Sequence, residues 1–267
     1  MLSSLQASQL PGLLAFWLPS LLACRPPGLL ASQLDAKFQR KDDFETMDNQ
    51  FTVYFAGSLF NHKDLTGNAL LAEYIEKCSD HKYRCCLPQN LEQHQTTAVE
   101  IRNQDIAKVI ECDLGLFNFD GTELDAGVVV EFMIAKFLDI PAVILRSDFR
   151  TGGEKEVGGE DWNFMCSFYP RTRIVKLNAI MSYQEALEAS QTLNEAIETY
   201  YSQMAQLIIE NLDAVRKEKT LLPGDRKKLE TLYQWALTFP GGGINTLVTC
   251  KPFLEQIIAA KIEKGLA

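Results

Sequence analysis

Residues 51–57 read Phe-Thr-Val-Tyr-Phe-Ala-Gly and open an alternation of strand-like and helix-like patterns. The segment is rich in β-branched and aromatic residues and ends in a Gly-Ser turn, which is typical of a buried parallel strand that runs into a loop. Apolar residues at helical spacing follow between Leu70 and Cys78. A strand followed by an amphipathic helix is the repeating unit of a parallel sheet.

The alternation continues for the next hundred or so residues. Another helix is predicted over 99–110, and further strands are predicted over 83–87, 114–119, 142–145 and 174–177. We therefore predict an α/β fold, a doubly wound parallel sheet of five strands. Because ligands of such sheets bind beyond the carboxyl ends of the strands, functional residues are expected near Gly57-Ser58 and from Asn118 onward.

The first 46 residues do not share this pattern. Prolines interrupt their apolar stretch, which therefore lacks the roughly 20 consecutive apolar residues of a membrane-spanning helix. No basic residue precedes Arg25, unlike in a signal peptide, although Leu21-Leu-Ala-Cys24 loosely resembles a lipoprotein cleavage site. We expect residues 1–46 to be an unstructured or non-native extension, with translation starting at Met47, and residues 47–190 to form the domain.

Residues 191–267 are predicted to be a helical extension. Ser182-Tyr-Gln-Glu185 has the pattern of a capping box, and helical periodicity continues from there to about Lys219. Two more helices are predicted over 226–237 and 252–264. The sequence leaves open whether this tail covers the domain, mediates dimerisation or binds a partner.

The composition excludes several classes of function. A formal charge of −9 argues against binding of a nucleic acid polymer, which needs clustered Lys and Arg. The seven cysteines form no CxxC pair and the three histidines show no metal-ligand spacing, so no metal or cofactor is predicted. An odd cysteine count without a disulfide framework favours the reducing cytoplasm.

The stretch 117–135 holds the most informative carboxylates. Asp120-Gly-Thr supplies turn chemistry after a strand, and Glu131 then stands alone among apolar residues. An unpaired carboxylate in such surroundings costs several kcal/mol of desolvation, which makes Glu131 a candidate for function. Periodicity alone equally allows a strand over 127–135 with Glu131 facing solvent.

Four segments, in the same order along the chain, resemble the nucleoside 2-deoxyribosyltransferase family. They cover about half of the chain and are Thr52–Phe60, Ile101–Ile106 followed by Cys112-Asp113, Asp125-Ala-Gly127 followed by Glu131, and Asp161–Met165. The resemblance implies a flavodoxin-like sheet and makes residues 127–138 a helix. Glu131 then lies in the second turn, near the positive end of the helix dipole, which favours an ionised nucleophile.

The resemblance also implies catalytic and binding roles. Glu131 would capture the anomeric carbon of deoxyribose, Tyr54 would hold Glu131, and Asp105 would be the general acid and base. Asp125 would bind sugar hydroxyls, and Gly57 and Ser58 would line the substrate site, although a simple turn role suits Ser58 better. Asn163, and less directly Met165, would complete the pocket of a neighbouring subunit.

The implied activity is transfer of 2-deoxyribose between nucleobases in nucleotide metabolism and salvage. Its partners are deoxynucleosides and free nucleobases, with neither a polymer nor a membrane involved, and its assembly is a homo-oligomer with shared sites. Val128 and Met133 stand where the family usually has Thr and Gly, which leaves the substrate preference open.

Two alternative functions remain. The first is a nucleoside 5′-monophosphate N-glycosidase, a hydrolase with a similar fold, although the anionic Asp125 would repel a phosphate. The second is a non-catalytic nucleotide-sensing module whose helical tail signals to a partner.

Overall fold

The computed structural model describes residues 50–91, 97–150, 161–222, 224–241 and 251–267, without the side chains of 251–253. Met47–Ala267 form one compact unit. The predicted extension over residues 1–46 lies outside the described residues, as do Pro223 and most of the Gly241–Gly243 segment.

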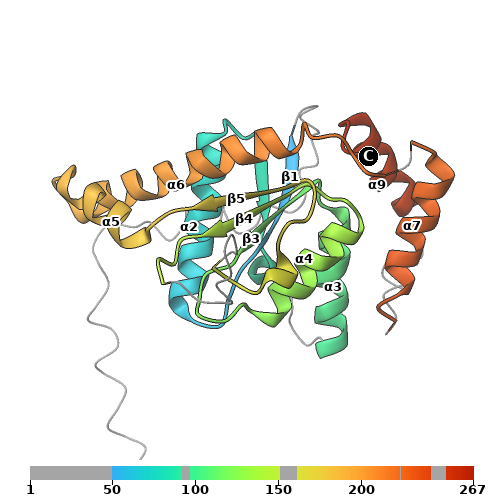
Figure 1. Cartoon of the computed structure of the whole chain (residues 1–267), viewed down its shortest axis with the longest axis horizontal. Coiled ribbons are helices and arrows are strands. Elements are labelled where there is room, and N and C mark those ends of the chain that lie inside the picture. The colour runs from blue at the N-terminus through green and yellow to red at the C-terminus, as the bar shows by residue number, and fades with distance from the viewer. Residues whose placement is uncertain (1–49, 92–96, 151–160, 223, 242–250) are drawn as a thin grey trace, which may run out of the picture. The chain divides into compact units, whose positions relative to one another are not determined.

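Five parallel strands form one sheet in the order β2-β1-β3-β4-β5 (Figure 1). Tyr54 in the central strand β1 pairs with Cys86 on one side and Gly115 on the other. This order is that of flavodoxin-like sheets, so the predicted fold class is confirmed. The strands are β1 (Phe51–Ala56), β2 (Tyr83–Cys86), β3 (Leu114–Asn118), β4 (Ala142–Arg146) and β5 (Thr172–Lys176).

Helices cover both faces of the sheet. Helices α2 (His62–Cys78) and α6 (Leu193–Val215) pack against each other and bury one face, which includes Val53 and Phe55 of β1. Helices α3 (Ala98–Glu111) and α4 (Ala126–Phe137) cover the other face, where Tyr54 points. Because strand side chains alternate between faces, Tyr54 lies in the layer that carries Glu131.

The segment that contains Glu131 is a helix and not a strand. Asp125 caps α4 by accepting hydrogen bonds from the backbone N–H groups of Gly127 (2.8 Å) and Val128 (3.2 Å). In the same helix Phe132 is buried, and its ring makes edge contacts with Phe117 and Phe119. Capping and aromatic packing therefore outweigh the strand preference of three consecutive valines.

The helix predicted to start at Ser182 begins earlier in the chain. Ser182 does not cap a helix, because it lies inside α5 (Ala179–Glu188), whose N-cap is Asn178. Thr192 instead caps α6, where its side chain accepts a hydrogen bond from the N–H of Glu195. The capping-box pattern at Ser182 was therefore wrong as a boundary, because the Asn178 amide cap precedes it.

Two helices near the C-terminus of the described chain pack on the layer of α3 and α4. Helices α7 (Arg226–Thr238) and α9 (Lys251–Glu263) contact each other, and Tyr233 and Ile258 are buried in the same core cluster as Phe132. The described residues also form short 3-10 helices at Pro88–Asn90 and Phe164–Cys166. No helix in the described part of the chain has the length and apolarity needed to cross a membrane.

Candidate active site

Glu131 is held by Tyr54 across the layer between strand and helix. The phenol Oη donates a hydrogen bond to Glu131 Oε1 at 2.7 Å. Tyr54 is almost fully buried in β1, and Glu131 is partly buried in the second turn of α4. The hydrogen bond predicted from the resemblance is thus present, and it leaves the second carboxylate oxygen for another partner.

The charge state of Glu131 results from opposing effects. Burial raises the pKa of Glu131 from 4.5 to about 7, and the charges of Asp105 and Asp125 raise it as well. The hydrogen bond from Tyr54 acts in the opposite direction and lowers this pKa. Burial and the two neighbouring carboxylates outweigh this hydrogen bond, so Glu131 is only partly ionised at neutral pH.

Asp105 lies on α3, close enough for its charge to raise the pKa of Glu131. Burial raises the pKa of Asp105 itself from 3.8 to about 6. Its Oδ1 atom is buried and has no hydrogen-bond partner among the described residues. A carboxyl group with such a pKa and a free oxygen can donate or accept a proton near neutral pH, as a general acid and base does.

Asp125 caps α4 in addition to its expected role in binding sugar hydroxyls. Only Oδ1 serves as the cap of α4, so the second oxygen makes no contact with the cap. The same helix therefore carries one carboxylate at its N-cap and another in its second turn. The two charges interact, since Asp125 raises the pKa of Glu131.

Gly57 and Ser58 follow β1 at the carboxyl edge of the sheet. A side chain at Gly57 would crowd Asn68 Oδ1 at 3.3 Å and Asn118 Cβ at 3.4 Å, which explains the glycine by close packing. The Ser58 hydroxyl donates to Asp64 Oδ2 at 2.8 Å, and its carbonyl accepts from Asn68 Nδ2 at 2.9 Å. Both residues shape this loop, and no contact of theirs reaches Glu131.

Asn163 and Met165 lie on a loop that Trp162 anchors. The Trp162 side chain is buried against Phe119, with the ring centroids 5.5 Å apart. Asn163 and Met165 themselves are exposed, and Asn163 Oδ1 accepts a hydrogen bond from the N–H of Met165 at 2.9 Å. Their hydrogen bonds within the described part of the chain involve neither Tyr54 nor Glu131.

Sequence reasoning missed the residues that fix the loop between β3 and α4. Arg146, buried at the end of β4, donates to the backbone carbonyls of Phe119 and Gly121. Asp120 accepts hydrogen bonds from the backbone N–H groups of Ser147 and Asp148. A lone arginine directly after the apolar run 142–145 was the signal that could have revealed this role.

Within the described ranges no three His, Cys, Asp or Glu side chains are grouped so that they could hold a metal ion. The arrangement instead suits covalent and acid-base chemistry: a nucleophilic carboxylate oriented by a phenol, with a second carboxyl of raised pKa nearby. Fold and site thus define a flavodoxin-like protein with a carboxylate-centred candidate active site.

Comparison with known proteins gives this site a family context. Residues 53–165 match the family model for nucleoside 2-deoxyribosyltransferase, which confirms the resemblance and includes every predicted site residue. The match indicates an enzyme with nucleoside deoxyribosyltransferase-like activity, and the family acts on small nucleosides and nucleobases.

Two solved structures are similar at low identity. A conserved protein from Enterococcus faecalis V583 is 23% identical, with 62% of this chain and 98% of that chain covered and a TM-score of 0.39. A 2-desoxiribosyltransferase from Leishmania mexicana is 21% identical, with 46% and 89% covered and a TM-score of 0.37. No curated protein matches this chain.

Proposed function

We propose that this protein transfers 2-deoxyribose between nucleobases through a covalent deoxyribosyl intermediate on Glu131. The observation that carries the proposal is the 2.7 Å hydrogen bond from Tyr54 to Glu131, beside the carboxyl of Asp105. A phenol bonded to one oxygen orients the carboxylate and leaves the other to attack. The family match supports the same chemistry.

In the first step an oxygen of Glu131 forms a bond to C1′ of the deoxyribose as the bond between C1′ and the base nitrogen breaks. Asp105 gives its proton to the departing base. In the second step the Asp105 carboxylate takes the proton of the incoming base, whose nitrogen attacks C1′ and releases Glu131. Two displacements at one carbon retain its configuration.

Asp125 would bind the sugar hydroxyls in this proposal. Its second oxygen is not used by the helix cap, and the carboxylate acts on Glu131 electrostatically. A carboxylate at this place favours a neutral sugar over a phosphorylated one, because like charges repel. This favours deoxynucleosides over 5′-monophosphates as substrates.

The transfer is tested with deoxyinosine in the presence and absence of free adenine. We expect continued hypoxanthine release and deoxyadenosine formation only when adenine is present. Without adenine at most one equivalent of hypoxanthine should be released per site, together with a deoxyribosyl adduct on the peptide that bears Glu131. Glu131→Gln should abolish both, while Glu123→Gln, a change at an exposed residue of the preceding loop, should leave the rate unchanged.

Three results would contradict the proposal. Equal hypoxanthine release without adenine would identify a hydrolase. Binding of deoxyinosine without turnover would favour a sensing module. Full activity of the folded Glu131→Gln variant would remove the nucleophile from the mechanism.

We further propose a homo-oligomer in which Asn163 and Met165 complete a neighbour's site. Both side chains are exposed on a loop that the buried Trp162 holds in place, and Phe164 between them is also half exposed. A rigid loop that presents apolar and amide groups to solvent suits an interface. The assembly is then part of the catalytic unit.

Complementation between two inactive variants tests the sharing of sites. A mixture of Glu131→Gln and Asn163→Ala chains, unfolded and refolded together, should regain activity, because some mixed sites carry both native residues. Each variant refolded alone is the control. A mixture that stays as inactive as its parts would show that each site uses one chain only.

A further inference from the structure

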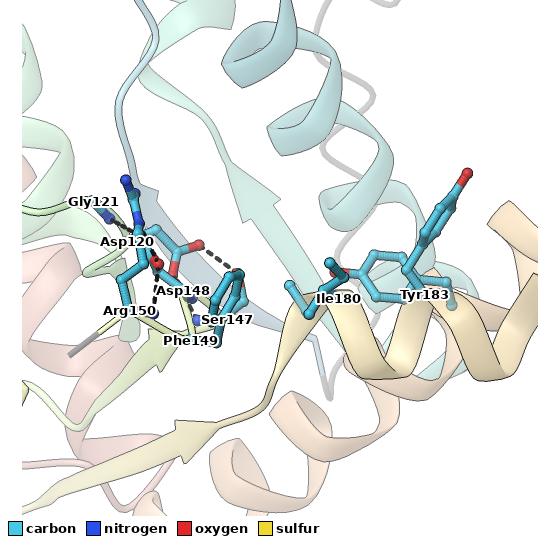
Figure 2. A pocket seen from close by; sticks show the side chains of 10 residues that line it. Asp120, Gly121, Ser147, Asp148, Phe149, Arg150, Ile180 and Tyr183 are labelled. Atoms are coloured by element: carbon cyan, nitrogen blue, oxygen red, sulfur yellow. Dashed lines mark hydrogen bonds and ion pairs between the residues drawn. The ribbon is translucent and has the colours of Figure 1, made fainter.

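A cavity of about 590 Å³, open to solvent, lies beyond the carboxyl ends of β3 and β4 (Figure 2). Its lining comes from the loops after these strands and from α5 and α6. None of Tyr54, Asp105, Asp125 and Glu131 lines it. The volume falls within the roughly 300–1,000 Å³ of small-molecule sites, and ligands of α/β sheets bind at this edge.

Apolar and aromatic side chains line both sides of the cavity. Ile180 and Tyr183 lie on one side and Phe149 lies on the other, beside the polar cluster (Figure 2), although these side chains are 47%, 37% and 56% exposed. The Tyr183 ring meets the Tyr200 ring edge-on, with the centroids 6.1 Å apart. Exposed apolar side chains gathered around a cavity mark a binding surface, and aromatic rings there favour a planar aromatic ligand.

The polar cluster consists of Asp120, Ser147, Asp148 and Arg150, and its charged groups already have partners. Asp120 accepts hydrogen bonds from Ser147 Oγ at 2.6 Å and from two backbone N–H groups. Arg150 Nε donates to Asp148 Oδ1 at 2.9 Å, so its charge is compensated. Figure 2 shows this cluster on the opposite side of the cavity from Ile180 and Tyr183.

The charges of this polar cluster restrict the ligand. Two carboxylates and the Arg150 guanidinium line the cavity, and the charge of the buried Arg146 beside them also reaches Asp148, so the charges balance and an anion finds no unpaired cation. A cation gains little, because Asp120 already accepts three hydrogen bonds and Asp148 is paired. Carboxylate oxygens can accept further hydrogen bonds from amino or ring N–H groups.

We propose that this cavity is a second binding site, without catalysis, for an uncharged planar heteroaromatic molecule of the size of a nucleobase or nucleoside. The ring would stack against Tyr183 and Phe149, and its N–H groups would face Asp120. We exclude catalysis because Ser147 is the only serine, threonine or cysteine among the described lining residues and is not activated. Its hydroxyl donates to Asp120, and the described lining contains no histidine or lysine that could take its proton. The proposal rests on this lining and not on the transfer reaction.

Calorimetric titration with adenine tests the site. We expect a binding event that survives in Glu131→Gln but weakens by about tenfold or more in Tyr183→Ala and Ile180→Asp, because stacking area and apolar contact are lost. Tyr183→Phe keeps the ring and should keep the affinity. Leu187→Ala is the matched control, since Leu187 is exposed on the same helix and does not line the cavity.

A second titration tests the charge argument. Adenosine should bind to the Tyr183-dependent site at least about tenfold more tightly than adenosine 5′-monophosphate, because the phosphate would lose hydration beside carboxylates whose guanidinium partners are already paired. Unchanged adenine affinity in the folded Tyr183→Ala and Ile180→Asp variants would overturn the site. Equal binding of the monophosphate would overturn the choice of ligand. Neither result depends on whether Glu131 transfers deoxyribose.

Discussion

At the scale of single residues, the hydrogen bond from Tyr54 limits how far burial raises the pKa of Glu131. Among the described residues this hydrogen bond lowers the pKa of Glu131, whereas burial and two neighbouring carboxylates raise it. Tyr54→Phe keeps the ring in its buried place and removes the donor. We expect the pKa of Glu131 to rise above about 7 and turnover at pH 7 to fall.

Carbon-13 NMR of labelled glutamate carboxyl groups measures this change. Tyr83→Phe is the matched control, because the Tyr83 hydroxyl donates to Asp213 at 2.6 Å on the other face of the sheet. An unchanged pKa of Glu131 in Tyr54→Phe would show that the phenol does not tune the carboxylate.

The raised pKa of Glu131 also predicts how stability depends on pH. Between about pH 4.5 and 7 the folded chain holds a proton on Glu131 that the unfolded chain has lost, so the free energy of unfolding decreases as pH rises. Glu131→Gln removes this contribution and should be more stable than the native protein at pH 8, with a smaller difference at pH 4.

Thermal unfolding at the two pH values measures the effect. Asp105 also makes the free energy of unfolding decrease as pH rises, since its pKa is raised to about 6. This contribution remains in Glu131→Gln. A parallel loss of stability in both proteins would mean that Glu131 is not protonated by burial.

At the scale of elements, Asp125 has two roles in α4. It caps the start of the helix, and its charge raises the pKa of Glu131 in the second turn. Asp125→Ala should lower the free energy of unfolding by about 1 kcal/mol, the usual cost of a lost N-cap. Asp125→Asn keeps an acceptor and should stay near native stability. Without the charge, the pKa of Glu131 should fall in both variants.

Urea denaturation and the activity assay separate the two roles. Asp225→Ala removes the corresponding cap of α7, where the carboxylate accepts from the N–H of Lys227, and should cost a similar free energy without changing the rate. Native activity of Asp125→Asn would argue against the contact with sugar hydroxyls.

At the scale of the whole molecule, Arg171 joins the sheet to the C-terminal segment. This buried guanidinium donates to Asp139 Oδ2 at 2.7 Å and to the carbonyl of Leu266 at 3.1 Å. Asp139 in turn accepts from the N–H of Leu221. Lys264 adds a second link through Asp113, at 2.7 Å.

Arg171→Ala should destabilise the fold by about 3–5 kcal/mol, because it leaves the buried carboxylate of Asp139 without its positively charged partner. Arg173→Ala on the same strand removes an exposed pair with Glu218 and should cost about 0–1 kcal/mol. Equal losses in urea denaturation would show that Arg171 does not hold the C-terminal segment to the sheet.

The sequence could predict the features that depend on local patterns. Alternating apolar segments predicted five strands within a residue or two of their observed ends, and the helix at 226–237 was confirmed by α7. The isolated Glu131 and the family motifs predicted the pair with Tyr54. The helix start near Ser182 failed, because several residue types can cap a helix and Asn178 comes first.

The sequence by itself thus determined the order of strands and helices and which carboxylates stand in apolar surroundings. Only the tertiary structure decided the place of α6 against the sheet, the hold of Arg146 on the loop after β3, and the cavity beside Tyr183. Periodicity shows that a helix has an apolar face but not which surface will cover it. Contacts between distant residues, and the burial that shifts the pKa values of Glu131 and Asp105, exist only once the chain has folded.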